Sequence, residues 1–376
     1  MMVFLDNAAT TFHKPSAVYR AVGATLKECS SVGRGGYPAA QLADRRGYET
    51  RAAVASLYNI DDPSAVIFTY NATVALNMAI KGLAKPGRVL ISGYEHNAVV
   101  RPLESLVRHG TEYSVAGSAL FDPDAMLAAF RGAIRSDTVL VVCNHVSNVF
   151  GSIAPIMEID EFCAERGLPL IIDASQSAGT IVIDTKKLRA AEFICMPGHK
   201  GLYGPQGTGV MLHVGERECS TIIEGGTGSN SALLEQPSFE PDKFESGTHN
   251  VAGIAGLGEG VRFILRETPV KILAHERDLT AYAASELKKL PDVTVCHSDD
   301  PNLQAGVLSF TVHGRECEDV AATLATAGIA VRAGLHCAPI AHRSAGTFPG
   351  GTVRVSPGHF STHRDIEKLI TAVRVL

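Results

Sequence analysis

The sequence of 376 residues contains no tryptophan, and aromatic side chains make up only 6% of it. No apolar run approaches the ~20 residues that a membrane-spanning helix requires, so we expect no membrane partner. No long basic run occurs and the formal net charge is −5, which disfavours a direct nucleic-acid partner. The N-terminal stretch lacks the basic lead of a signal peptide. The expected location is cytoplasmic.

Two nucleotide-binding patterns, G-x-G-x-x-G and the P-loop, are also missing. The eight cysteines include no C-x-x-C pair, and their scatter over a long chain argues against a disulfide framework or a zinc site. No metal site is therefore expected. In a cytosolic protein most cysteines should be small, buried apolar side chains, but Cys337 stands apart because of its surroundings.

Short apolar runs rich in Val and Ile recur along the chain, and helical patterns separate them. Such runs suit strands that are buried on both faces, and their alternation with helices predicts an α/β fold with a mostly parallel sheet. The expected strands are 65–68, 88–92, 138–143, 168–172 and 209–213, and the expected helices include 122–134 and 156–166.

A different pattern occupies the last third of the chain. A helical stretch over about 250–290 precedes strand-like segments at 292–297 and 306–313, a helix near 317–327 and a last helix from Thr362. A chain of this length has enough material for two domains. We therefore predict a large α/β domain of residues 15–255 and a smaller α+β domain of residues 1–14 and 256–376.

Functional side chains are expected where the strands end, because ligands of open parallel sheets bind outside the carboxyl ends of the strands. Asp173 follows the run 168–172, and a carboxylate there can keep the ring nitrogen of pyridoxal phosphate (PLP) protonated. Lys200 lies in a glycine-rich turn after another apolar run, where a desolvated amine is a better nucleophile for an aldehyde. The plain alternatives are a helix N-cap or a loop acid for Asp173 and a solvated surface lysine for Lys200.

A phosphate group binds best at a helix start that also offers small hydroxyl groups. The segment from Thr69 through Ala72 and Thr73 follows the expected strand 65–68 and opens a helical pattern. This segment fits a phosphate site, and it also fits an ordinary capped helix.

Motifs along nearly the whole chain carry a family likeness through their order and spacing. The chain resembles the class V, fold-type I PLP enzymes, and within them the cysteine desulfurases and selenocysteine lyases. The matching motifs are LDNAAT (5–10), GRGG (33–36), NAT (71–73), EHN (95–97), SNVFG (147–151), DASQ (173–176), GHK (198–200), FESGT (244–248), AVR (330–332), GLHC (334–337) and VR (353–354). The resemblance implies PLP as cofactor, a seven-stranded sheet in the large PLP-binding domain, and a homodimer.

The resemblance also implies which residues hold the cofactor ring. Lys200 would carry PLP as a Schiff base and later move the substrate's protons. Asp173 would pair with the pyridine nitrogen, and Gln176 would hydrogen-bond the phenolic oxygen. His96 would stack on the ring face, and Asn148 would contact the ring or the substrate.

The same resemblance implies which residues bind the phosphate of the cofactor. Ala72, Thr73 and His199 would hold the phosphate, together with the partner subunit's Thr248. One departure affects this end, because Pro197 stands where the family usually has Ser or Thr. Proline supplies neither a hydroxyl nor an N–H group, so the phosphate must find a donor elsewhere.

At the substrate end, Arg354 would bind the substrate carboxylate as a bidentate fork, with Arg332 and Asn148 beside it. Cys337 would attack the substrate sulfur, so that alanine leaves and a persulfide remains on the enzyme. Nearby cations lower the pKa of a thiol from about 8.5, and Arg332 and His336 lie close in sequence. A buried, inert cysteine is the alternative.

The main prediction is a PLP-dependent cysteine desulfurase that converts L-cysteine to L-alanine, with a protein sulfur acceptor as a candidate partner. A selenocysteine lyase is a close variant. Another class V PLP reaction, such as transamination, epimerisation or β-elimination, would make Cys337 a spectator. A sulfur-relay or scaffold protein that has lost catalysis is a further alternative, and it would stay colourless when PLP is added.

Overall fold

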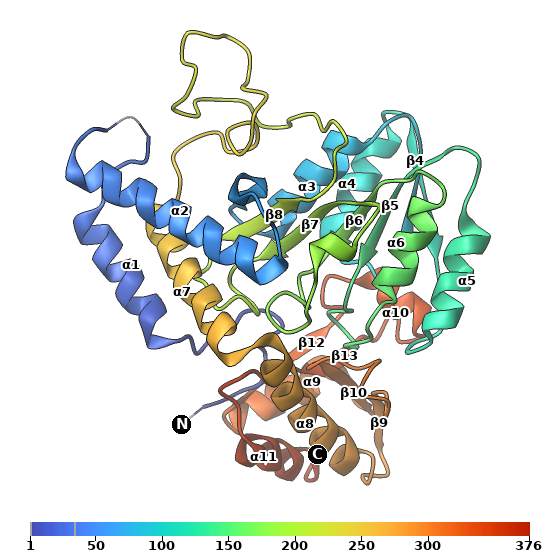
Figure 1. The fold of residues 1–376 in the computed structure, drawn as a ribbon. Coiled ribbons are helices and arrows are strands. Elements are labelled where there is room, and N and C mark those ends of the chain that lie inside the picture. The colour runs from blue at the N-terminus through green and yellow to red at the C-terminus, as the bar shows by residue number, and fades with distance from the viewer. Residues whose placement is uncertain (1, 34) are drawn as a thin grey trace.

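The computed structural model describes residues 2–33 and 35–376. Within these residues the central sheet has seven strands in the order β2-β8-β7-β6-β5-β3-β4. Neighbouring strands pair in parallel except β8, which runs antiparallel to both β7 and β2. The predicted mostly parallel α/β sheet is therefore confirmed (Figure 1).

The elements of this part of the fold agree with the expected strands and helices to within two residues at each end. Its strands are β2 (Val66–Thr69), β3 (Gly87–Ser92), β4 (Thr111–Ala116), β5 (Thr138–Asn144), β6 (Leu170–Asp173), β7 (Ala191–Pro197) and β8 (Gly209–His213). Its helices are α1 (Ser16–Glu28), α2 (Pro38–Tyr58), α3 (Ala72–Leu83), α4 (Asn97–Val107), α5 (Pro123–Ala133), α6 (Ile156–Ala164) and α7 (Val251–Glu267), with short 3₁₀ turns at Pro63–Ala65 and Thr185–Lys187.

Successive residues of the central strands point to two separate apolar cores. Leu90 and Val141 face one core, which includes side chains of α2, α5, α6 and α7. Val89 and Leu140 face the other, which includes side chains of α3 and α4. Both faces of the sheet are thus buried, which explains why its strands read as continuous apolar runs.

A smaller antiparallel sheet lies below the large one in Figure 1. Its order is β12-β13-β10-β9, and a separate short parallel pair joins β1 to β11. The strands are β1 (Val3–Phe4), β9 (Val293–Cys296), β10 (Leu308–Val312), β11 (Ile329–Ala330), β12 (Arg332–Gly334) and β13 (Thr352–Val355), and the helices are α8 (Pro269–Leu287), α9 (Cys317–Thr326), α10 (Pro339–Ser344) and α11 (His363–Val373).

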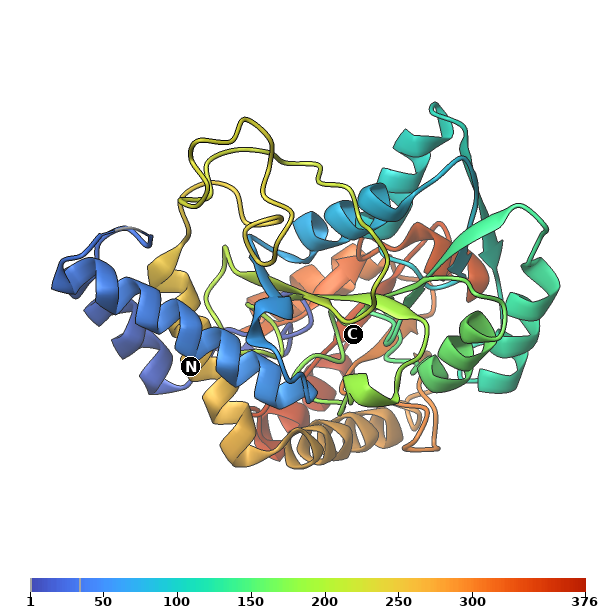
Figure 2. The ribbon, with the colours of Figure 1, turned by 45° about the horizontal axis from the view of Figure 1, so that its top comes forward.

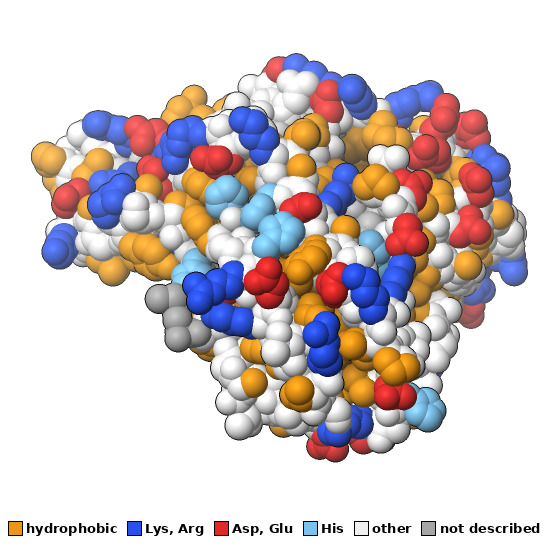
Figure 3. All heavy atoms as spheres, turned by 90° about the horizontal axis from the view of Figure 1, so that it is seen from below, with side chains coloured by type: hydrophobic (Ala, Val, Ile, Leu, Met, Phe, Trp, Pro, Cys, Tyr) orange, Lys and Arg blue, Asp and Glu red, His pale blue; other side chains and the backbone are white. Residues whose placement is uncertain are grey.

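The start of the chain shares an apolar core with this smaller unit. Val3 and Leu5 pack in one cluster with Leu308 and Val353. This packing fits the grouping of residues 1–14 with 256–376, although the division at residue 255 falls inside α7 and stays a prediction. Charged side chains of both signs mix with apolar ones on the face seen from below (Figure 3).

The expected helical stretch over 250–290 is two helices instead of one. It breaks between α7 and α8 at Thr268, whose φ is +71°. Pro269 explains the break, because proline has no N–H to continue the helix and disfavours a helical residue before it.

Two parts of the chain project beyond the large sheet in both ribbon views, namely the α1–α2 pair and the segment between β8 and α7 (Figures 1 and 2). They expose large apolar side chains, including Leu26, Tyr48 and Leu234. Within residues 2–33 and 35–376 there is no helix with the length and apolar character that crossing a bilayer demands.

Candidate functional site

A cavity of about 210 Å³ lies where β5 and β6 end and where α3 and α4 begin. It brings together every predicted site residue except Thr248. Those lining it are Ala72, Thr73, His96, Asn148, Asp173, Gln176, His199, Lys200, Arg332, Cys337 and Arg354. Side chains from both ends of the chain and from both sheets therefore meet at one place, as the rule for parallel sheets predicts.

Thr11 fixes the backbone of the turn that carries Lys200. The Thr11 hydroxyl donates to the Lys200 carbonyl over 2.8 Å, and the Thr11 N–H donates to the His199 carbonyl over 3.0 Å. Burial lowers the pKa of the Lys200 amine to about 8, while the Asp173 carboxylate acts in the opposite direction. Near neutral pH a useful fraction of this amine is therefore uncharged and nucleophilic.

Asp173 ends β6 and is only 4% exposed. One of its carboxylate oxygens accepts a hydrogen bond from the Ser175 N–H over 2.9 Å. A buried carboxylate requires a cationic or hydrogen-bonding partner. Because Asp173 lines the cavity, a protonated ring nitrogen placed there would supply one.

His96 caps the start of α4 with its ring. Its Nδ1 accepts from the Ala98 N–H over 3.0 Å, so the proton of the neutral ring is assigned to Nε2. Burial lowers the pKa of His96 to about 4, although Asp173 opposes this shift. The imidazole is thus neutral at pH 7 and fixed in orientation by the helix that it caps.

The start of α3 forms the far end of the cavity. Asn71 caps this helix by accepting from the Val74 N–H over 3.0 Å, and Ala72 and Thr73 occupy the first helical positions, whose N–H groups point out of the helix. Such a helix start attracts anions. His199 lies beside it with a buried Nδ1 that has no hydrogen-bond partner in the described part of the chain.

Gly209 and Pro197 are paired in the β7–β8 ladder and do not themselves line the cavity, although Gly209 lies against Asn71, which does. A Cβ at Gly209 would lie 2.7 Å from the Asn71 carbonyl carbon, so only glycine fits there without a shift of the backbone. Pro197 is buried at the end of β7 and brings no hydroxyl to the cavity.

Arg354 is 2% exposed, and two of its guanidinium nitrogens already donate hydrogen bonds within the protein. Nη2 donates to Asp6 over 2.7 Å and Nη1 donates to the Asn148 carbonyl over 2.9 Å, whereas Nε is buried without a partner among the described residues. A carboxylate would therefore meet the remaining N–H groups or compete with Asp6. Sequence reasoning missed Asp6 because its partner lies 348 residues away.

Glu95 is a second residue that sequence reasoning did not assign. It is fully buried behind the cavity, and its Oε1 accepts from the Ser92 hydroxyl over 2.6 Å and from the Asn144 N–H over 2.8 Å. Burial raises the pKa of Glu95 to about 8, and Asp173 adds to this shift. Asn144, which is paired with Asp173 across β5 and β6, lines the cavity itself. The sequence offered one signal for Glu95, because it is the first residue of the EHN motif (95–97).

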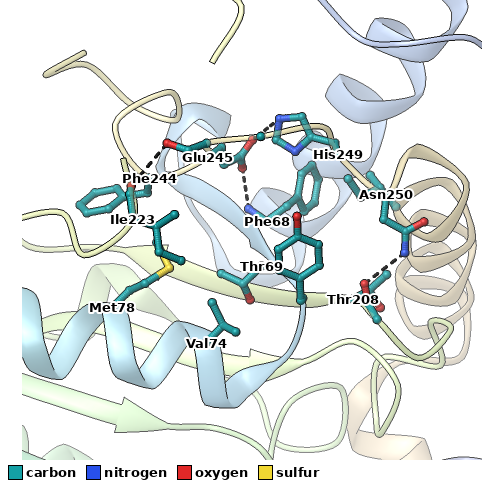
Figure 4. Close-up of a pocket in the computed structure, with 15 residues that line it drawn as sticks. Phe68, Thr69, Val74, Met78, Thr208, Ile223, Phe244, Glu245, His249 and Asn250 are labelled. Atoms are coloured by element: carbon teal, nitrogen blue, oxygen red, sulfur yellow. Dashed lines mark hydrogen bonds and ion pairs between the residues drawn. The ribbon is translucent and has the colours of Figure 1, made fainter. Parts of the chain in front are cut away.

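Thr248 lies apart from this cavity and is exposed. It belongs to the segment 244–250, which borders a second cavity of about 150 Å³ (Figure 4). Glu245 anchors that segment, because it accepts from the Phe68 N–H over 2.6 Å and forms an ion pair with Arg51 at 2.5 Å. His249 lies 3.5 Å from the same carboxylate.

The motif GRGG (33–36) cannot be placed completely. Its Arg34 lies outside the described residues.

Known proteins that resemble this chain belong to one enzyme family. The family model for aminotransferase class-V matches residues 3–369. Among similar proteins, a probable cysteine desulfurase of Methanothermobacter thermautotrophicus is 32% identical, over 98% of this chain and 92% of the relative. A probable cysteine desulfurase of Pyrococcus abyssi is also 32% identical, over 100% of this chain and 93% of the relative.

Solved structures extend the likeness to the fold. The apo structure of a cysteine desulfurase from Thermococcus onnurineus matches with a TM-score of 0.91 at 30% identity, covering 100% of this chain and 94% of that one. The cysteine desulfurase CsdA of Escherichia coli matches with a TM-score of 0.87 at 27% identity, over 99% of this chain and 94% of that one. Since the family match spans nearly all of the sequence, the chain belongs to the aminotransferase class-V family.

Proposed function

We propose that this protein is a PLP-dependent cysteine desulfurase that converts L-cysteine to L-alanine and keeps the sulfur as a persulfide on Cys337. The observation that carries the proposal is one cavity in which an exposed cysteine meets Lys200, Asp173 and Arg354. Relatives at 32% identity over nearly the full chain bear the name probable cysteine desulfurase, which supports the same reaction.

The residues of the cavity suit PLP. A lysine amine with its pKa lowered to about 8 would hold the aldehyde, and a buried carboxylate would pair with the ring nitrogen. The Nδ1 of His199, which has no hydrogen-bond partner within residues 2–33 and 35–376, and the start of α3 offer hydrogen bonds to a phosphate. PLP bound in this way would supply an electron sink for bond cleavage at the substrate's carbon atoms.

The protein's own groups account for the other parts of the reaction. Arg354 would orient the substrate through its carboxylate, and the Lys200 amine would move protons once it is free. Cys337 Sγ would form a bond to the substrate sulfur while the bond between that sulfur and Cβ breaks. One thiol of the enzyme and one cysteine thus give one enzyme persulfide and one alanine, and the proton count balances.

A homodimer is part of the proposal. Thr248 is exposed on an anchored segment and does not line the cavity of its own subunit, which suits a hydroxyl that reaches the phosphate of a partner subunit. The exposed apolar side chains on the projecting α1–α2 pair and the segment between β8 and α7 are available for such an interface. A thiol of a protein sulfur acceptor would then take the outer sulfur of the persulfide, which leaves a persulfide on the acceptor and restores the Cys337 thiol.

The test is to incubate the PLP-loaded protein with L-cysteine and a reductant and to measure alanine and sulfide. We expect equal amounts of both, and we expect the Cys337→Ala protein to form neither while keeping the visible absorbance of bound PLP. Full activity of the variant would contradict the proposed role of Cys337. A PLP-loaded parent protein that forms no alanine would contradict the proposed substrate.

A further inference from the structure

The Cys337 loop has an unusual backbone. His336 and Cys337 are consecutive residues with left-handed conformations, at φ values of +49° and +57°. Each such residue that is not glycine costs about 1–3 kcal/mol and persists only where its surroundings hold it. Specific contacts must therefore keep the thiol in place.

Two hydrogen bonds attach the carbonyl groups of this pair to the start of α4 and to the turn after β5. The Asn148 side-chain amide donates to the His336 carbonyl over 2.8 Å, and the Asn97 N–H donates to the Cys337 carbonyl over 2.7 Å. Asn97 directly follows His96, and Asn148 lines the cavity. Residues that adjoin or line the cavity thus hold both peptide groups.

The His336 ring provides a third attachment. It is 5% exposed, and its Nε2 lies 3.0 Å from the Thr352 carbonyl. A carbonyl only accepts, so Nε2 carries the proton and donates. Thr352 is itself bonded to Ser309, whose hydroxyl donates to the Val149 carbonyl over 2.6 Å. This network returns to the residue that follows Asn148.

Asn148 also connects the loop to the guanidinium of Arg354. Its backbone carbonyl accepts from Arg354 Nη1, while its side-chain Oδ1 is buried without a partner in the described part of the chain. The same residue therefore touches the group proposed to bind the substrate carboxylate and the peptide that presents the thiol.

We infer that Asn148 and His336 are positioning residues that hold the left-handed His336–Cys337 pair, and with it the Cys337 thiol, against the cavity. This inference rests on the proposed function for its chemical meaning, since a fixed thiol matters when it must meet a substrate sulfur. The holding itself is a property of the folded protein and can be measured without turnover.

Hydrogen exchange of single amides in the PLP-loaded protein tests the inference. The Asn97 N–H reports directly on the loop, because its acceptor is the Cys337 carbonyl. The Val99 N–H, which donates to the His96 carbonyl over 2.9 Å in the same helix, is the matched control. Loss of one buried hydrogen bond is expected to open the loop about tenfold more often.

The variants form a matched set. His336→Asn tolerates a left-handed backbone, but its amide is too short to reach Thr352, whereas the amide of His336→Gln can replace Nε2. We expect exchange of Asn97 to rise about tenfold in His336→Asn and in Asn148→Ala. It should stay within about twofold of the parent in His336→Gln, with Val99 unchanged in all three.

The kinetics provide a second readout. In His336→Asn, the rate constant for alanine formation should fall about tenfold while KM for L-cysteine changes little, because the thiol and not the carboxylate site is displaced. Unchanged exchange of Asn97 in both His336→Asn and Asn148→Ala would overturn the inference, as would His336→Gln behaving like His336→Asn. If exchange responds as expected but the parent forms no alanine, the inference stands and the proposed function fails.

Discussion

Replacement of Glu245 by glutamine is the perturbation whose size follows most directly from the structure. Glu245 is 5% exposed, and its carboxylate accepts hydrogen bonds from both terminal nitrogens of Arg51, at 2.7 and 2.5 Å. It also accepts from the Phe68 N–H, and the Arg51 guanidinium lies over the Phe68 ring at 4.3 Å. The amide of glutamine carries no charge, and its nitrogen cannot accept a hydrogen bond.

Breaking a buried ion pair by removing one partner costs about 3–5 kcal/mol. The Arg51 side chain keeps 14% exposure, which gives the orphaned charge some contact with water and favours the lower end of that range. We therefore expect Glu245→Gln to lower the free energy of unfolding by about 3 kcal/mol. With a urea m-value of about 3 kcal/mol/M for a large chain, the midpoint should fall by about 1 M.

The control is Glu28→Ala, which removes an exposed pair with Arg46 at 3.2 Å. Exposed pairs contribute only about 0–1 kcal/mol, so this midpoint should barely move. Equilibrium urea titrations of the three proteins, followed by circular dichroism, provide the comparison. Equal shifts for Glu245→Gln and Glu28→Ala would refute the reasoning that Glu245 anchors the segment carrying Thr248.

Three further predictions concern the cavity. The rate at which PLP attaches to Lys200 should rise with pH around a midpoint of about 8, because only the neutral amine reacts; a midpoint above 10 would show an unshifted lysine. Because the pKa of Glu95 is raised to about 8 in the folded state, folding takes up a proton between its unfolded pKa and about 8. Stability should fall as pH rises through that window, a slope that a Glu95→Gln protein should lack in pH-dependent unfolding measurements. Gly209→Ala should weaken PLP binding about tenfold or more in equilibrium titrations, because the added Cβ displaces the Asn71 backbone by overpacking; Gly132→Ala, which meets open space, should leave PLP binding unchanged.

Local patterns predicted the regular elements well because burial on both faces leaves a strong signal. The apolar run before Asp173 and the helix start at Ala72 were both found from the sequence, and the structure places them at one cavity. The prediction of a single helical stretch over 250–290 missed the break at Thr268, although Pro269 was a readable signal for it.

The contacts that complete the site could not be predicted, because they join residues far apart in sequence. The Asp6–Arg354 ion pair spans 348 residues and the Asn148–His336 hydrogen bond spans 188. Hydrophobic periodicity does not indicate such pairs, because neither residue has a local sequence pattern that depends on its distant partner. The left-handed backbone at His336 was equally hidden, because histidine gives no preference as strong as that of glycine.

The path of residues 3–11 has a consequence for biosynthesis. These residues pair with β11, bond to Ser356 beside β13, and support the Lys200 turn. The earliest part of the chain must therefore wait for some of the last strands to be made before it reaches its place. A nascent chain that stalls before β13 has Lys200 but lacks both Arg354 and the contacts that order its N-terminal segment. The contacts that anchor residues 3–6 are thus complete only after both β11 and β13 have been made.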